Sequence, residues 1–263
     1  MTTVLVTNDD GMGSAGLCTL ATAAVEAGFD VIIAAPREQS SGSSASIIAS
    51  EDDGRIRIER RELEGLEGIP SFAVHGAPSL IALIAAHGAF GPVPDLVLSG
   101  INHGANVGRA ILHSGTVGAA LTGGLNGARA LAVSLDVGVS PVDYEWDAAA
   151  AVARLVLPTL LEMPVGTVFN LNVPNVPQPV ELREAHLAPF GIVQTTMEHA
   201  DEHHVTLAVE DLPNTPEPGS DAALLAEGFA TLTSITPVAS VPLTIPLETY
   251  AAAARTAPGT TTP

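Results

Sequence analysis

The sequence predicts an α/β fold with a mostly parallel sheet and a smaller, partly β appendage in its carboxyl-terminal part. Apolar runs at residues 4–6 and 31–35 have the composition and length of buried parallel strands. The stretch between them, residues 17–27, is rich in Ala, has helical spacing and closes at Gly28-Phe29. These segments form a β-α-β unit, which later strands and helices repeat.

The remaining elements continue this alternation up to Pro174. We expect further strands at residues 55–60, 71–74, 95–99, 129–134 and 168–173, and helices at residues 78–87, 114–127 and 144–161. Residues 55–60 alternate polar and apolar side chains, which indicates a half-exposed strand in a hairpin or excursion. Pro158 is expected to kink or shorten the last of these helices. His75-Gly76 is interpreted as a turn, and no chemical role is assigned to it.

The pattern divides the chain into three regions. Residues 1–174 form the predicted α/β core, which carries the candidate site. Residues 175–255 form the predicted appendage, with short β-like segments such as 205–209, a helix at 221–227 and a strand at 230–235. The Thr- and Pro-rich residues 256–263 are expected to form a disordered tail.

The composition excludes several classes of protein. The chain has 263 residues, of which 46% are hydrophobic and 15% charged, and can bury the core of one large domain. Its formal net charge of −19 argues against binding a nucleic-acid polymer, because that affinity depends on neutralising phosphates. All ten basic residues are Arg, and the absence of Lys excludes a P-loop and lysine Schiff-base chemistry.

The sequence carries no signal for export or membrane insertion. Met1-Thr2-Thr3 leads straight into the first strand without a charged leader region, and no apolar run has the length of a membrane span. The single Cys18 lies in an apolar helical stretch, which excludes an internal disulfide and favours a packed thiol. We therefore expect a cytoplasmic protein with no membrane partner.

Two adjacent carboxylates follow the first strand. The apolar run breaks into Thr7-Asn8-Asp9-Asp10-Gly11, at the edge where open α/β sheets bind their ligands. Because Gly11 permits the chain to turn, both Asp side chains can face one object, where they repel unless they share a proton or a cation. A bound divalent metal ion is the simplest explanation for two adjacent carboxylates, since hard cations take oxygen ligands. A helix N-cap is the alternative, but it accounts for only one of the two acids.

Three loops at predicted strand ends carry small side chains with oxygen atoms: Asp9, Asp10, Ser41, Asn102 and Asn106. In a parallel sheet these strand ends share one edge, so the side chains can meet and form a site for a hard cation. Each residue, taken alone, also has an ordinary role in a turn. The stretch Ser114-Gly115-Thr116 begins a predicted helix and suits either a phosphate or an ordinary Ser N-cap.

Two other motifs point to different functions. Gly11, Gly13 and Gly16 match the G-x-G-x-x-G fingerprint of dinucleotide-binding proteins, between a strand and a helix. In that interpretation the two acids lie beside a pyrophosphate with no cation, and the second strand ends without an acid for the ribose. Residues 199–203 match the inverted zinc-protease pattern H-x-x-E-H, but the β-like run beginning at Val205 favours a solvated loop there.

The acidic pair, the loops at the strand ends and the start of the helix after residue 114 together resemble the motifs of the SurE survival-protein family of metal-dependent 5'/3'-nucleotidases. The resemblance rests on the strings NDDG at residues 8–11 and SGIN-x-G-x-N-x-G at residues 99–108, in that order. It is extended by the Ser41-Gly42 loop, Ser114-Gly115-Thr116-Val117, Asn170-Leu171-Asn172-Val173-Pro174, Asp221, Gly228 and Thr236-Pro237. It therefore covers most of the chain, apart from the carboxyl-terminal end.

The resemblance implies a Rossmann-like three-layer α/β/α core and a homodimer or homotetramer built through the carboxyl-terminal part. It implies hydrolysis of nucleoside monophosphates with one divalent metal ion, either Mg, Mn or Co. The implied metal ligands are Asp9, Asp10, Ser41 and Asn102, and the implied phosphate-binding residues are Gly42, Asn106, Ser114, Gly115 and Thr116. Asp9 is the candidate for orienting or deprotonating the attacking water, and Asp10 is mainly a ligand.

The chain departs from the family pattern at a few positions. Gly13-Ser14-Ala15 stands where the family usually has His-Ala-Pro, Arg37 where it often has Asp, Ser40 where it often has Arg, and His113 where it usually has Tyr. The implied metal ligands are all present, so these departures bear on substrate preference and rate.

Overall fold

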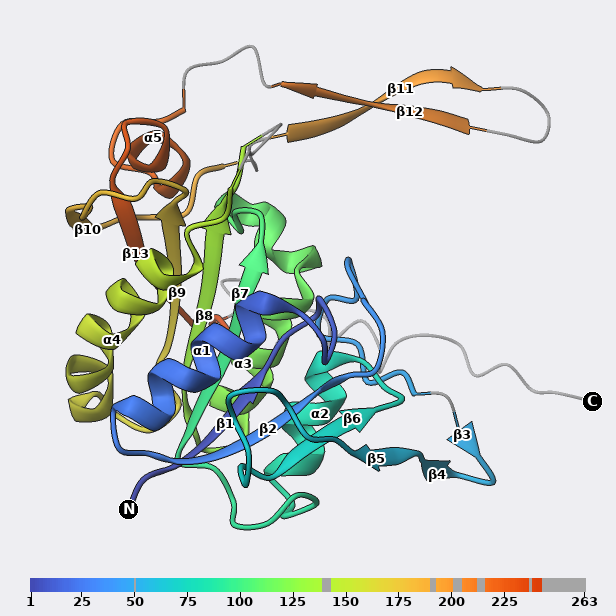
Figure 1. The fold of residues 1–263 in the computed structure, drawn as a ribbon. Helices are drawn as coiled ribbons and strands as arrows, with labels where there is room; N and C mark the ends of the chain where they lie inside the picture. Colours follow the sequence, from blue (N-terminus) through green and yellow to red (C-terminus); the bar gives the residue numbers. More distant parts are fainter. Residues whose placement is uncertain are drawn as a thin grey trace, which may run out of the picture.

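The computed structural model describes residues 1–49, 51–138, 143–189, 193–200, 205–211, 216–236 and 238–242. Its centre is a nine-stranded sheet with the order β10-β13-β9-β8-β7-β1-β2-β6-β5 (Figure 1). The strands are β1 (Thr3–Thr7), β2 (Asp30–Pro36), β5 (Ile58–Arg60), β6 (Ser71–Val74), β7 (Leu96–His103), β8 (Arg129–Asp136), β9 (Val168–Pro174), β10 (Leu182–Glu184) and β13 (Ala230–Ile235). The helices in the described ranges are α1 (Ala15–Glu26), α2 (Pro78–Ala85), the short 3-10 helix η1 (Gly108–His113), α3 (Gly115–Leu125), α4 (Trp146–Glu162) and α5 (Asp221–Ala226).

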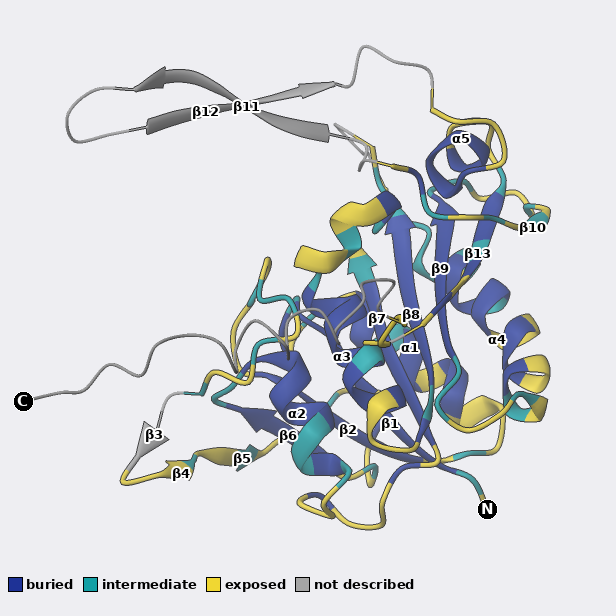
Figure 2. Ribbon diagram, turned by 180° about the vertical axis from the view of Figure 1, so that it is seen from behind, coloured by how far each residue is buried: buried dark blue, intermediate teal, exposed yellow. Residues whose placement is uncertain are grey.

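Two hydrophobic cores lie on the two faces of the sheet. Successive side chains of a strand point to opposite faces, so Val4 and Val6 pack with Leu17 of α1 and with α4, whereas Leu5 packs with Ile81 of α2 and with α3. Each of these aliphatic side chains, when fully buried, contributes about 1.5–3 kcal/mol. Figure 2 shows the buried sheet between its helical layers. The predicted three-layer α/β/α arrangement is confirmed.

The order in which strands join the sheet reverses at β1, while the strand direction stays the same. β2 pairs in parallel with one edge of β1, and β7 pairs in parallel with the other edge. The carboxyl ends of β1 and β7 therefore flank a topological switch point, where open α/β sheets bind their ligands. Asp9 and Asp10 directly follow β1, and Asn102 lies near the end of β7.

The sheet continues beyond residue 174, the predicted boundary of the core. β13 pairs antiparallel with β9, and β10 pairs in parallel with β13, so two strands of the predicted appendage extend the central sheet. β11 (Val193–Ala200) and β12 (Val205–Asp211) form a separate antiparallel ribbon that projects from the body (Figure 1). The short strands β3 (Glu51–Asp52) and β4 (Arg55–Ile56) form a second small hairpin. The predicted tail, residues 256–263, lies outside the described residues.

Two local expectations differ from the structure. Pro158 lies inside α4, which continues to Glu162, so the proline does not shorten the helix. The hydrogen bond that it removes is offset by the buried side chains of Leu157 and Leu160 in the same turn. The first two residues of the H-x-x-E-H pattern belong to β11 rather than to a loop, because they pair with β12, and residues 201–204 are not described. Within the described ranges, no helix has the length and apolar character needed to span a membrane.

Candidate metal and phosphate site

The turn after β1 is built by Asn8. Its side-chain amide donates hydrogen bonds to the Gly11 carbonyl oxygen (3.1 Å) and to Ser14 Oγ (2.6 Å), and its Oδ1 accepts one from the Gly11 N–H (3.2 Å). Gly11 has a φ of 98°, in the left-handed region that favours glycine. Ser14, where the chain departs from the family pattern, also caps α1 by accepting a hydrogen bond from the helix backbone. Asn8 therefore shapes the turn and leaves the two Asp residues at its tip.

Asp9 is a buried carboxylate, with 4% of its surface exposed. The hydroxyl of Thr116, in the first turn of α3, donates a hydrogen bond of 2.5 Å to Asp9 Oδ1. Burial raises the pKa of the Asp9 carboxyl and the neighbouring charge of Asp10 raises it further, while the Thr116 hydrogen bond acts in the opposite direction. The ionised carboxylate is therefore destabilised unless a cation neutralises it.

Asp10 and Ser41 are brought together by Gln39, in the loop that follows β2. Gln39 Nε2 donates to Ser41 Oγ at 2.9 Å and to Asp10 Oδ1 at 3.3 Å. Asp10 Oδ2 accepts a hydrogen bond of 3.0 Å from the backbone N–H of His103, the last residue of β7. Three strand ends thus meet at Asp10, as the parallel sheet predicts.

Asn102 reaches the same place through an irregularity in β7. The register between β7 and β8 shifts at Gly100, where an added Cβ would lie 2.2 Å from a carbonyl oxygen of β8. Asn102 Nδ2 donates to a backbone carbonyl oxygen two residues on, at 2.8 Å, and Asn102 Oδ1 lies 3.3 Å from Thr116 Oγ1. Because Thr116 donates its only hydroxyl proton to the buried acid, Asn102 Oδ1 keeps its lone pairs for a ligand.

These side chains fit a hard divalent cation. Asp9, Asp10, Ser41 and Asn102 offer carboxylate, hydroxyl and amide oxygens, which are the donors that Mg and Mn prefer. In the part of the chain that the structure describes, no group of three or more His, Cys, Asp or Glu side chains gathers to hold a metal. A cation at this site would therefore meet two carboxylates and neutral oxygen donors, which is a set for a hard ion rather than for zinc.

Gly115 lets the start of α3 pack closely against Asp9 and Ser43. Gly115 has no side chain, and a Cβ there would lie 2.5 Å from Ser43 Oγ and 2.8 Å from Asp9 Oδ2. The Ser43 hydroxyl is buried and has no hydrogen-bond partner. This unpaired hydroxyl beside a carboxylate oxygen lacks a polar partner, which a bound ligand would supply.

The predicted phosphate residues of α3 lie at the beginning of that helix. Ser114 is the N-cap and accepts a hydrogen bond of 3.1 Å from the Val117 N–H, so the capping role considered from the sequence is present. This bond uses an oxygen lone pair of Ser114 and leaves its hydroxyl proton available to an acceptor. The helix N-terminus beside it presents backbone N–H groups toward the same edge of the sheet, which favours an anion.

Asn106 is held by buried polar residues of β8 and β9. Its N–H donates to Asn172 Oδ1 at 2.7 Å, and its Nδ2 donates to Ser134 Oγ at 2.9 Å. Its carbonyl oxygen accepts hydrogen bonds from Asn170 Nδ2 (2.8 Å) and Asn172 Nδ2 (2.9 Å). These contacts fix the loop after β7 rather than joining Asn106 to the acidic pair, so its role toward a phosphate stays a prediction.

The fold itself explains two of the three glycines in the G-x-G-x-x-G string. Gly11 forms the turn described above, and a Cβ at Gly16 would lie 2.1 Å from the Ile101 carbonyl oxygen. Gly16 therefore lets α1 pack directly against β7, whereas Gly13 has open space around it. Two of the three glycines are explained by the turn and by helix packing, and neither requires a bound dinucleotide.

Two residues beside the candidate site, Gln39 and Ser43, were not predicted from the sequence. Both flank Ser41 in an irregular loop, where no periodic pattern distinguishes a residue that faces the site from one that faces solvent. Their only signal in the sequence was their nearness to Ser41.

Known relatives match this chain over most of its length. Residues 4–199 match the model of a protein family described as survival protein SurE. A protein named 5'-nucleotidase SurE from Desulfitobacterium hafniense (strain DSM 10664 / DCB-2) is 42% identical over 175 residues, which cover 66% of this chain and 65% of that protein. A 5'-nucleotidase SurE from Solidesulfovibrio magneticus is 37% identical over 241 residues, 88% of this chain and 90% of that protein. A 5'/3'-nucleotidase SurE from Proteus mirabilis is 36% identical over 209 residues, 78% of this chain and 74% of that protein.

A solved structure shares the fold. The crystal structure of the SurE protein from Aquifex aeolicus superposes with a TM-score of 0.71 and covers 90% of this chain and 94% of that chain, at 24% sequence identity. The family match spans both strings that the sequence analysis singled out, including the acidic pair and Asn102. The chain belongs to the SurE survival-protein family.

Proposed function

We propose that this chain is a metal-dependent phosphomonoesterase that hydrolyses nucleoside monophosphates to a nucleoside and phosphate. The observation that carries the proposal is the buried Asp9 carboxylate beside Asp10 at the switch point of the sheet. The names of the relatives, 5'-nucleotidase SurE and 5'/3'-nucleotidase SurE, support this substrate class.

Asp9, Asp10, Ser41 and Asn102 are the residues that would hold one divalent ion, either Mg, Mn or Co. When bound, such an ion supplies Lewis-acid chemistry, which neutralises phosphate charge and makes water more acidic. The donor set supports this assignment, because its two carboxylates balance the charge of a divalent cation and its other two oxygens are neutral.

We assign to Asp9 the orientation or deprotonation of the attacking water. Its Oδ1 is held by Thr116, while its Oδ2 lies close to Gly115, where a Cβ would be only 2.8 Å away. The Ser114 hydroxyl would donate a hydrogen bond to a phosphoryl oxygen, helped by the N–H groups at the start of α3, while the Thr116 hydroxyl holds Asp9 beside the phosphate. Gly42 and Asn106 would complete the surroundings of the phosphate.

We also infer a cytoplasmic homodimer or homotetramer that assembles through residues 175–255. The ribbon of β11 and β12 supports this inference, because it stands outside the nine-stranded sheet. A two-stranded ribbon is only marginally stable by itself and gains stability from a partner surface.

Phosphate release from adenosine 5'-monophosphate tests the proposed reaction. We expect the chelated protein to release almost no phosphate, and Mn²⁺, Mg²⁺ or Co²⁺ to restore release, because phosphoryl charge then has a counter-ion. A colorimetric phosphate assay across these ions measures the effect. Activity that survives chelation would contradict the metal requirement, and NAD(P) affinity without phosphate release would favour the dinucleotide alternative.

Gly115→Ala is expected to reduce kcat for this reaction by about a hundredfold, since displacing a reacting group by about 1 Å has an effect of that size. The new methyl group would lie 2.8 Å from Asp9 Oδ2 and force the carboxylate or Ser43 to move. Gly13→Ala is the matched control, because a Cβ at Gly13 meets nothing within 4 Å. Equal activity of the two variants would show that the close packing of Gly115 against Asp9 and Ser43 has no part in the reaction.

A further inference from the structure

A pocket of about 660 Å³ adjoins the candidate site. Its walls come from the segment 36–49, which carries the Ser41-Gly42 loop, and from the segment 74–77 at the end of β6. Gly42 and Ser43 lie in one part of the wall, next to the predicted phosphate position, and Arg37 and His75 lie in another. The volume falls within the range of about 300–1,000 Å³ that is typical of small-molecule sites.

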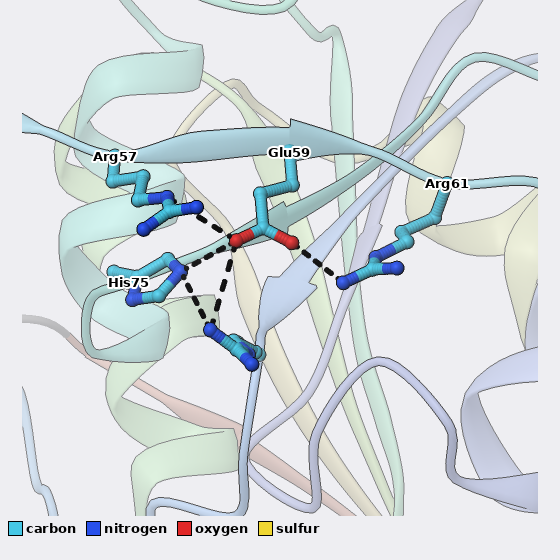
Figure 3. Close-up of polar contacts among 5 residues, drawn as sticks. Arg57, Glu59, Arg61 and His75 are labelled. Atoms are coloured by element: carbon cyan, nitrogen blue, oxygen red, sulfur yellow. Dashed lines mark hydrogen bonds and ion pairs between the residues drawn. The ribbon is translucent and has the colours of Figure 1, made fainter.

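Arg37 and His75 belong to a cluster of basic side chains around Glu59 (Figure 3). Alternate residues of a strand share a face, so Arg57, Glu59 and Arg61, in and beside β5, point the same way. β5 pairs antiparallel with β6, and β6 pairs in parallel with β2. His75 directly follows β6, and Arg37 directly follows β2. The cluster therefore lies at the same edge of the sheet as Asp9, but toward its outer strands.

The cluster holds more positive charge than its one carboxylate can neutralise. Around the Glu59 carboxylate lie His75 Nε2 at 3.0 Å, Arg57 Nε at 3.3 Å, Arg37 Nη1 at 3.7 Å and Arg61 Nη2 at 2.5 Å. The His75 hydrogen bond and the three Arg charges lower the pKa of Glu59, which stays ionised at neutral pH. Three guanidinium groups and one carboxylate leave an excess of two positive charges.

The three Arg side chains are also more exposed than the carboxylate that they surround. The side chain of Glu59 is 21% exposed, whereas that of Arg37 is 45% exposed. Arg37 makes the longest of the four contacts, and the same Nη1 lies 3.5 Å from His75 Nε2, so the N–H donors on its other two nitrogens remain for a ligand in the pocket. Of this cluster, Arg37 and His75 line the pocket, together with the acidic Glu38, and the Arg37 guanidinium is the group on that wall that can pair with an anion.

We propose that the Arg37 wall of this pocket binds a second phosphate group of the substrate. The inference rests on the proposed function, in which the phosphate to be hydrolysed lies at the acidic pair and the rest of the nucleotide extends into the pocket. A nucleoside monophosphate has no second anion for this wall to bind. The preferred substrates are therefore nucleotides with two phosphate groups, and Arg37 is a specificity-determining residue that contacts the second one.

A comparison of the turnover of three nucleotides tests this subsite. Values of kcat/KM with Mn²⁺ are compared for adenosine 3',5'-bisphosphate, adenosine 5'-diphosphate and adenosine 5'-monophosphate. Arg37→Ala is expected to lower the ratio of a two-phosphate nucleotide to the monophosphate by about tenfold, the effect of losing a charge-assisted hydrogen bond. Arg37→Lys should keep part of the ratio, because it retains the charge but not the planar fork.

Arg154→Ala is the matched control. Arg154 is 44% exposed and pairs with Glu26 at 2.6 Å, on α4 and α1 outside the pocket, so its loss should leave the ratio unchanged. If Arg37→Ala lowers kcat/KM for the bisphosphate alone, the second phosphate is the one on the ribose. If Arg37→Ala lowers kcat/KM for the diphosphate alone, the second phosphate belongs to the phosphate chain. If Arg37→Ala lowers kcat/KM equally for all three nucleotides, or for none of them, the subsite is overturned while the proposed reaction stands.

Calorimetric titration of the metal-free protein separates this inference from the proposed function. Adenosine 3',5'-bisphosphate and adenosine 5'-diphosphate should each be titrated against the wild type and Arg37→Ala. If the wild type releases no phosphate from any nucleotide, the proposed function fails. Tighter binding of a two-phosphate nucleotide by the wild type than by Arg37→Ala then still supports the subsite, and equal binding by the two proteins overturns it.

Discussion

Asp9→Asn is expected to lower metal-dependent phosphate release by about a thousandfold or more, since metal and base contribute several kcal/mol to the transition state and each 1.36 kcal/mol is tenfold. The amide cannot deprotonate water, and it offers a neutral oxygen in place of an anionic one. The hydrogen bond from Thr116 to Oδ1 can persist, so the surrounding structure keeps its shape. Steady-state phosphate release at saturating Mn²⁺ measures the loss.

The same substitution should not destabilise the metal-free protein. Burial and Asp10 raise the pKa of Asp9 above its value in the unfolded chain, so the folded state loses stability as pH rises through the interval between the two values. At pH 7 the amide removes that penalty, and the variant should melt at or above the wild-type temperature. Asp30→Asn, an exposed change at the opposite end of β2, controls for loss of charge alone. Full activity in the folded Asp9→Asn variant would show that the Asp9 carboxylate takes no part in the reaction.

The central sheet was predictable because its strands are short and continuously apolar. Runs such as residues 4–6 and 31–35 are buried on both faces, and such runs have few alternatives in a globular protein. The pairing of β13 with β9 was not predictable in the same way. Residues 230–235 alternate in polarity, and their partner lies some sixty residues earlier in the chain, so only the folded sheet reveals the contact.

The candidate site was predictable to the extent that its residues follow strand ends. Asp9, Asp10 and Asn102 belong to strings that interrupt apolar runs, and parallel strands bring those ends to one edge. The cluster around Glu59 was not predicted, and His75 was given no chemical role. Its convergence with Arg37 depends on the register of β5 on β6 and of β6 on β2, which the local sequence does not specify.

Asp221→Ala is expected to reduce the free energy of unfolding by about 3–5 kcal/mol, the range for breaking a buried, fully bonded charged group. Asp221 is fully buried, its Oδ2 accepts the Gly108 N–H at 2.8 Å, and its Oδ1 accepts the N–H groups of Ala188 (2.9 Å) and Ala222 (2.8 Å). One side chain at the start of α5 thus ties the start of η1 to the segment that follows β10. Urea denaturation followed by circular dichroism measures the change.

The substitution should lower activity as well as stability, because Gly108 lies two residues after Asn106 and closes the loop that carries it. Asp147→Ala is the control: this acid is exposed in the first turn of α4, where its interaction with the helix dipole contributes about 0.3–1 kcal/mol. An Asp221 variant within about 1 kcal/mol of the wild type would show that the three N–H groups find water instead. A large loss of stability with unchanged turnover by the remaining folded protein would separate this anchor from the phosphate site and leave Asn106 without a part in the reaction.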